Sequence, residues 1–147
     1  MQNQTNDVQA LEAELKPVKK LPADPNKAMQ QMMNTIDALR EKVTAETAAL
    51  KEADTKQFMT LQDDKIIIAR DYLNGMKDLL GRGDDLKNAD PLLLQRFTEM
   101  REQFGELVKD NLEALKRMGG GMKKLEERII NAARIESDKE NKFSYGA

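Results

Sequence analysis

The chain has 147 residues, 24 basic and 26 acidic side chains, and a formal net charge of −2. A charged fraction of 34% with only 4% aromatic residues favours helices with apolar stripes over a thick core. The absence of cysteine and histidine excludes disulfides, thiolate metal sites and the commonest general base. The slightly acidic balance argues against nucleic-acid binding. We therefore expect a single-domain, soluble, helix-rich protein that works by binding, without a cofactor.

Two features of the sequence bear on its location in the cell. No apolar run approaches the roughly 20 residues needed to span a bilayer, so membrane insertion is not expected. The first seven residues are polar and show no secretory signal. These features predict a cytoplasmic protein.

Residues 1–24 are predicted to be a flexible N-terminal segment with one short helix. Val8, Leu11 and Leu15 recur at helical spacing. Pro17 should end this helix, because proline disfavours the helical conformation in the residue before it. Residues 25–147 are predicted to form the main domain.

A long helix is predicted to begin at Asp24-Pro25, because aspartate can cap free amides and proline suits the first helical position. Its apolar stripe consists of Met29, Met32, Ile36, Leu39, Val43, Leu50, Phe58, Leu61, Ile68, Tyr72, Met76 and Leu79. No glycine or proline interrupts it before Gly75, and Gly81 is a natural end. The stripe predicts one helix of about 57 residues, on the order of 85 Å long.

A glycine-rich turn over 81–89 separates this helix from a second one that starts at Asp90-Pro91. The second stripe consists of Leu93, Phe97, Met100, Phe104, Leu107, Asn111, Leu115, Met118, Met122, Leu125 and Ile129. All its steps are three or four residues, which is typical of an amphipathic helix. Helicity should fade after Ile135, which leaves a loose C-terminal end.

The two stripes predict an all-α fold, a long antiparallel helical hairpin with a short extra N-terminal helix. A short turn between long helices makes them antiparallel neighbours. Their nearly heptad spacing suits a segmented antiparallel coiled coil. In this arrangement, residues whose numbers sum to about 171 should face each other.

Gly119-Gly120-Gly121 lies within the second stripe and costs about 3 kcal/mol of helix stability. It predicts a helix break or kink with a third helix from Met122, a flexible hinge, or a close crossing against Ala48, Ala49 and Ala53. Asn111 lies in the same stripe, where a polar residue fixes the register of a helix interface.

Several apolar residues lie beside the predicted seam. They are Ile66, Ile67, Ile68, Tyr72 and Leu73 in the first helix, and Val108, Leu112, Ile130 and Ile135 in the second. A single partner helix covers only one stripe, and a helix that is apolar over a wide arc needs a second neighbour. We expect self-association or a partner protein to cover the remaining apolar surface.

The sequence offers no catalytic or metal site. The adjacent carboxylates Asp63-Asp64 and Asp84-Asp85 have no basic or metal-binding companion, and neighbouring helical residues do not share a face. They are interpreted as solvated surface. No phosphate loop, Ser/Lys dyad or zinc spacing occurs, so an enzyme is not expected.

An ordered set of residues runs through both stripes: Glu46, Ala49, Leu50, Asp54, Leu61, Lys65, Asn111, Gly120, Tyr145 and Gly146. It resembles the FlgN family of flagellar export chaperones. In that family a Glu-x-x-Ala-Leu-x-x-x-Asp segment precedes a leucine and a lysine, an asparagine follows, and many members end in a tyrosine-glycine region. The resemblance covers about residues 28–147.

The resemblance implies a non-catalytic, cytosolic type III export chaperone for flagellum biogenesis. Such proteins bind helical terminal segments of the hook–filament junction (hook-associated) proteins and present them to the flagellar export apparatus. A client helix would dock by helix-in-groove recognition. The predicted client-binding residues are Leu107, Leu115, Met118, Met122, Leu125 and Ile129. The C-terminal end, with Phe143 and Tyr145, is predicted to contact the export gate.

Two other classes are compatible with the same patterns. A self-associating structural coiled coil would bury the spare apolar surface in a homodimer. An amphipathic protein that coats lipid or polymer granules should carry lysine and arginine on its polar faces. Acidic residues balance the basic ones here, so the granule-coating class is disfavoured.

Overall fold

A computed structural model describes residues 20–118 and 125–132 of the chain. Its elements are α2 (Pro25–Lys51), α3 (Thr55–Gly81), α4 (Gly83–Lys87), α5 (Pro91–Arg117) and a helix at residues 125–132. No strand occurs in these two ranges, so the predicted all-α class is confirmed for them. The predicted N-terminal helix and Gly119-Gly120-Gly121 lie outside the described residues.

The predicted helix starts at the two Asp-Pro pairs are confirmed. Asp24 Oδ2 accepts a hydrogen bond from the backbone N–H of Lys27 at 2.9 Å, at the start of α2. Asp90 Oδ1 accepts one from Leu92 N at 3.0 Å, at the start of α5. Each carboxylate satisfies a backbone donor that has no partner within its helix. The predicted turn between the long helices contains the five-residue helix α4.

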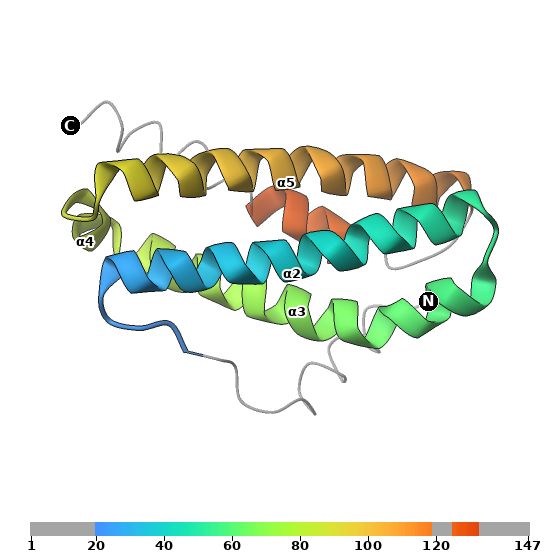
Figure 1. Cartoon of the computed structure of the whole chain (residues 1–147), viewed down its shortest axis with the longest axis horizontal. Helices are drawn as coiled ribbons and strands as arrows, with labels where there is room; N and C mark the ends of the chain where they lie inside the picture. Colours follow the sequence, from blue (N-terminus) through green and yellow to red (C-terminus); the bar gives the residue numbers. More distant parts are fainter. Residues whose placement is uncertain (1–19, 119–124, 133–147) are drawn as a thin grey trace.

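The prediction of one continuous helix from Pro25 to Gly81 is wrong. The helix ends at Lys51, and α3 begins at Thr55, so residues 52–54 form a tight connection. Asp54 starts α3, because its Oδ1 accepts from Gln57 N at 3.0 Å. The chain therefore reverses in the middle of what reads as a single apolar stripe (Figure 1).

A Schellman motif explains the end of α2. Asp54 N donates to Ala49 O at 2.8 Å, and Ala53 N donates to Leu50 O at 3.2 Å. This pair of hydrogen bonds satisfies the last carbonyl groups of a helix. It requires a left-handed backbone conformation at the first residue after the C-cap, which here is Ala53. Ala53 takes that conformation, with φ of 56°. Glycine usually occupies this position, and alanine adopts it at a steric cost.

Helices α2 and α3 pack against each other in antiparallel directions. Lys42 Nζ lies 3.3 Å from Asp64 Oδ2. Farther along the pair, a Cβ added to Gly75 in α3 would overlap the side chain of Met32 in α2. The missing side chain at Gly75 lets the two helices approach closely at this point.

Helices α2 and α5, in contrast, run parallel. Asp90 N donates to Asn26 Oδ1 at 2.9 Å near the starts of the two helices. Asn111 Nδ2 donates to Thr47 Oγ1 at 3.0 Å near their ends, and both pairs are 64 residues apart in sequence. In a parallel pair of helices, the numbers of facing residues keep a constant difference, whereas in an antiparallel pair they keep a constant sum. The predicted register, with a sum of about 171, is therefore wrong for the pairing of α2 with α5.

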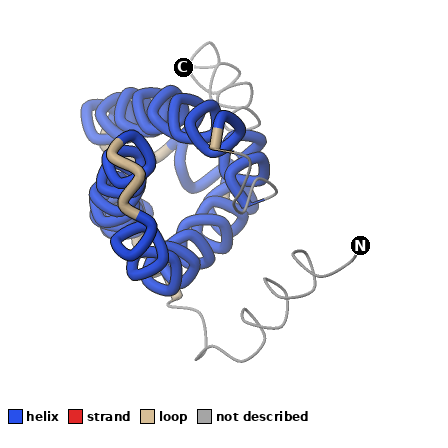
Figure 2. Tube along the Cα trace, turned by 90° about the vertical axis from the view of Figure 1, so that its right-hand side faces the viewer, coloured by secondary structure: helices blue, strands red, loops and turns tan. Residues whose placement is uncertain are grey.

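The helices are arranged around one long axis, along which Figure 2 looks. Tyr72 of α3 and Phe104 of α5 meet edge to face, with ring centroids 5.4 Å apart. The 125–132 helix adds Leu125, Ile129 and Ile130, all buried, to the same apolar core. This additional helix and the reversal at residues 52–54 turn the expected hairpin into a bundle.

The bundle covers most of the surface that was expected to need a partner. Val108, Leu112 and Ile130 are buried within the chain, so the expectation of external cover is wrong for them. Ile66 is also buried, whereas the neighbouring Ile67 is 37% exposed. None of the helices within residues 20–118 and 125–132 is both long and apolar enough to cross a bilayer.

Candidate functional site

Five charged or amide side chains meet inside the bundle, and we call them the polar cluster: Glu46, Gln62, Lys65, Asn111 and Glu126. Lys65 Nζ lies 2.8 Å from Glu46 Oε1 and also donates to Glu126 Oε1. Glu46 accepts two further hydrogen bonds, from Gln62 Nε2 at 2.5 Å and from Asn111 Nδ2 at 2.8 Å. Helices α2, α3 and α5 and the 125–132 helix thus all contribute to one buried network.

The charges of the polar cluster are unequal. Lys65, Glu46 and Glu126 are each 0% exposed, and one ammonium faces two carboxyl groups. Burial raises the pKa of the Glu126 carboxyl above its ordinary value of 4.5; Lys65 opposes this rise, and the negative charge of Glu46 adds to it. Glu126 Oε2 has no hydrogen-bond partner among the described residues. The raised pKa favours the uncharged form of Glu126, which lessens the excess negative charge of the cluster.

Residues that carry the sequence resemblance come together in this cluster. Glu46, Lys65 and Asn111 lie on three different helices, yet their side chains form direct hydrogen bonds. Asp54 has a different role, since it caps α3. These residues therefore fix the packing of the bundle, and Asn111 occupies the helix-interface position predicted for it.

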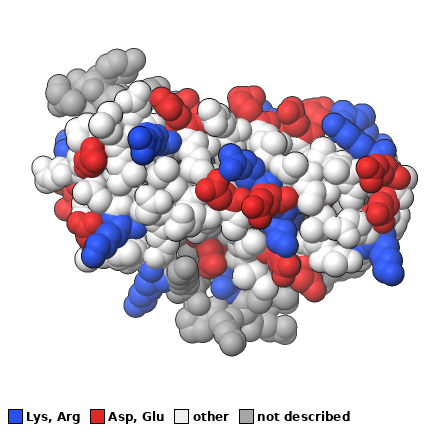
Figure 3. Space-filling model, viewed as in Figure 1, with Lys and Arg blue, Asp and Glu red and all other residues white. Residues whose placement is uncertain are grey.

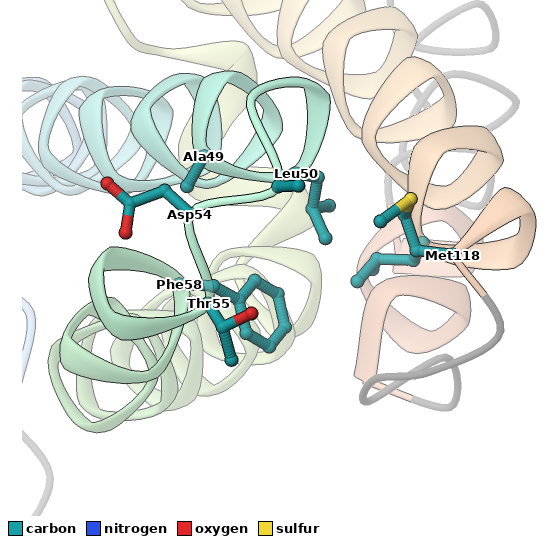
Figure 4. A pocket seen from close by; sticks show the side chains of 8 residues that line it. Ala49, Leu50, Asp54, Thr55, Phe58 and Met118 are labelled. Carbon is teal, nitrogen blue, oxygen red and sulfur yellow. The ribbon is translucent and has the colours of Figure 1, made fainter.

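An apolar depression opens at the end of the bundle where α2 joins α3, and we call it the end hollow. Its volume is about 180 Å³. It is lined by Ala49, Leu50, Ala53, Asp54, Thr55, Phe58, Leu115 and Met118. Figure 4 shows Leu50, Phe58 and Met118 around this space, while the carboxylate of Asp54 points away from it.

The end hollow lies one helical turn beyond the polar cluster. Leu50 follows Glu46 by four residues in α2, and Leu115 follows Asn111 by four residues in α5. In α3, Gln62 Nε2 donates to the backbone carbonyl of Phe58, four residues earlier. Residues four apart share one face of a helix, so the hollow and the cluster are successive layers of the same bundle interior.

The structure separates the predicted client-binding residues. Leu115 and Met118 line the end hollow, and Met118 is 54% exposed. Leu125 and Ile129 are buried in the bundle core, and Leu107 is half-buried. Met122, Phe143 and Tyr145 lie outside the described residues. Client binding and export-gate contact by these residues stay predictions.

Three residues of the site, Thr55, Gln62 and Glu126, were not singled out in the sequence, and Phe58 was predicted only as part of the apolar stripe. Glu126 was hidden because it follows Leu125 of the stripe directly. A usable signal exists at Lys65, because Leu61, Lys65, Ile68 and Tyr72 follow steps of four, three and four, which place the lysine on the buried face. A charged residue in that position requires a buried partner.

Surface charge does not single out a ligand class. Acidic and basic side chains are intermingled over the face shown in Figure 3. The predicted solvated carboxylates Asp63, Asp64, Asp84 and Asp85 are exposed. Within residues 20–118 and 125–132, no group of acidic side chains is arranged to hold a metal ion. Comparison of the chain with protein-family models, curated proteins and solved structures gives no match.

Proposed function

We propose that the chain is a cytosolic flagellar export chaperone of the FlgN type. It binds helical terminal segments of hook–filament junction proteins and delivers them to the export gate. The observation that supports this proposal most is the end hollow, an apolar depression open to solvent at one end of a helical bundle. It adjoins the polar cluster, which contains three of the residues on which the resemblance depends.

The chemistry of the end hollow suits an apolar side chain of a helical client. Leu50, Phe58 and Leu115 form an apolar floor, and Met118 is exposed at the rim. Methionine is flexible and polarisable, and it is frequent on surfaces that accept varied partners. Helix-in-groove recognition requires an apolar anchor point of this kind.

The proposal is tested by titrating the purified chain into a fluorescently labelled terminal segment of a junction protein. Met118→Asp is expected to weaken binding at least about tenfold, because it places a carboxylate where the client's apolar side chain would be desolvated. Leu92→Asp is the matched control. Leu92 is 68% exposed near the start of α5, at the other end of the bundle, so its substitution should leave the affinity unchanged.

Two outcomes would contradict the proposal. One is the absence of any binding of junction-protein segments by the folded chain. The other is a tight homodimer in sedimentation experiments with no affinity for helical segments, which would support the self-associating structural coiled coil instead.

A further inference from the structure

The 125–132 helix occupies one position of the bundle through a short apolar pattern. Leu125, Ile129 and Ile130 are buried, and the next residue after Leu125 is Glu126 of the polar cluster. Positions one, five and six of this helix are therefore apolar, and position two faces Lys65. These four side chains show what kind of helix the position accepts.

The apolar side chains of this helix are buried in the bundle, but its carboxyl group is poorly matched to the charges of the polar cluster. Lys65 already has a carboxylate partner, Glu46, within 2.8 Å. Glu126 adds a second buried carboxyl group, and its Oε2 has no hydrogen-bond partner among the described residues. A buried carboxyl group without full compensation weakens the packing of the element that carries it.

The same position reaches the polar layer, which lies one helical turn from the end hollow. Glu46 and Asn111 hold the polar layer, and Leu50 and Leu115, one turn farther, line the hollow. A helix longer than the described 125–132 segment, seated in its place, would extend from Lys65 into this depression. The hollow is then the open end of a groove of which the 125–132 helix fills the inner part.

We infer that the groove now filled by residues 125–132 is the binding site for the client helix, which takes the place of these residues. This inference rests on the proposed chaperone function and specifies the partner. The client helix carries an apolar residue, then glutamine or asparagine, and apolar residues three and four positions after the amide. One further apolar residue, a turn before the amide, enters the end hollow.

The amide follows from the electrostatics of the polar cluster. Its carbonyl oxygen accepts a hydrogen bond from Lys65 Nζ, as Glu126 Oε1 does. Its NH₂ group is a hydrogen-bond donor, like the amide groups of Gln62 and Asn111 that already donate to Glu46. An uncharged side chain leaves Lys65 and Glu46 as a balanced pair, so the client avoids the excess buried carboxylate.

The test uses two variants of the full chain and a synthetic helical peptide with the Leu-Gln-x-x-Ile-Ile pattern. Ile129→Asp removes an apolar contact of the resident helix, and we expect about tenfold tighter peptide binding, because a larger fraction of the groove is open. Glu126→Gln removes the excess carboxyl group and seats the resident helix more firmly, so binding should weaken. A matched peptide with aspartate in place of each isoleucine should not bind. Circular dichroism checks that both variants remain folded.

The opposite order of affinities would overturn the inference. If the client packs against Ile129, as predicted from the sequence, Ile129→Asp weakens binding. Equal affinity of the peptide for all three chains, or no binding to any of them, also overturns it. Should Ile129→Asp unfold the chain, Glu126→Gln alone decides, since tighter or unchanged binding contradicts displacement.

The same variants separate the inference from the proposed function. If junction-protein segments bind with equal affinity to all three chains, the chaperone function is supported and the displacement is wrong. If the synthetic peptide follows the expected order and no junction-protein segment binds, the groove is supported and the proposed client is wrong.

Discussion

Lys65 in α3 and Glu126 in the 125–132 helix form an ion pair whose side chains are 1% and 0% exposed. Glu46 of α2 contacts the same ammonium group, so Lys65 lies between two buried carboxyl groups. The stability of the bundle should therefore depend strongly on Lys65.

Lys65→Met is expected to destabilise the chain by about 3–5 kcal/mol, because it leaves buried carboxyl groups without their cation. Urea unfolding followed by circular dichroism measures the change. Lys42→Met is the control, since Lys42 pairs with Asp64 at the surface and its loss should cost less than about 1 kcal/mol. Combining Lys65→Met with Glu46→Gln and Glu126→Gln should recover much of the loss. Equal effects of the two lysine substitutions would contradict the buried network.

The stability of the chain should depend on the protonation of Glu126. Burial raises the pKa of this carboxyl in the folded state above 4.5, so the folded chain retains a proton that the unfolded chain releases. The contribution of Glu126 to the free energy of unfolding therefore falls as pH rises from about 4.5 through the raised pKa, and is level above it. Lys65, Glu46 and the amides of Gln62 and Asn111 are the groups that surround this site.

Glu126→Gln isolates this contribution from those of other carboxylates. The variant should be more stable than the unaltered chain at neutral pH, and its advantage should shrink as pH falls toward 4.5. Urea unfolding of both chains at matched pH values measures the difference. An advantage that is independent of pH would show that Glu126 is ionised throughout.

Local signals in the sequence were sufficient to predict where α2 and α5 begin and where α3 ends. Asp24-Pro25, Asp90-Pro91 and Gly81 act on their own neighbours, so no tertiary information is needed. The Asn111 interface role also followed from its place in the stripe. The partners of Asn111, Glu46 and Thr47, could not be predicted, because the helix against which α5 packs depends on the reversal at residues 52–54.

That reversal was missed because its two signals are unusual. The left-handed residue is Ala53 instead of glycine, so no glycine marks the end of α2. The start of α3 is marked only by Asp54 and Gln57, spaced as in a capping box. The apolar stripe continues in phase across the break, and periodicity alone cannot distinguish one long helix from two. In the 125–132 helix, Leu125 and Ile129 of the predicted stripe are buried, whereas the burial of Glu126 was missed.

Ala53→Gly should stabilise the chain by up to about 1 kcal/mol. Glycine removes the penalty of roughly 1–2 kcal/mol for a left-handed alanine, and its greater freedom in the unfolded chain offsets part of this gain. Thermal unfolding measures the change, and Ala53→Val should move the melting temperature the other way, because β-branched residues disfavour positive φ. A loss of stability in Ala53→Gly would contradict the Schellman motif.

Gly75→Leu should destabilise the chain by about 1–3 kcal/mol, because the added side chain must displace Met32 between α2 and α3. Met32→Ala alone leaves a cavity and should cost about 2–5 kcal/mol. The double variant should cost less than the sum of the two, since leucine fills the space that methionine vacates. Additive costs in this double-mutant cycle would show that the residues do not share that space.

The parallel pairing of α2 with α5 has a consequence for the order of folding. Helices α2 and α3 are joined by three residues, whereas the paired residues of α2 and α5 are 64 apart in sequence. Loop-closure entropy therefore favours early formation of the α2–α3 pair. During synthesis this pair can assemble before α5 has left the ribosome, with Glu46 and Lys65 already in contact. The nascent chain thus acquires its central salt bridge first and adds the remaining helices to it.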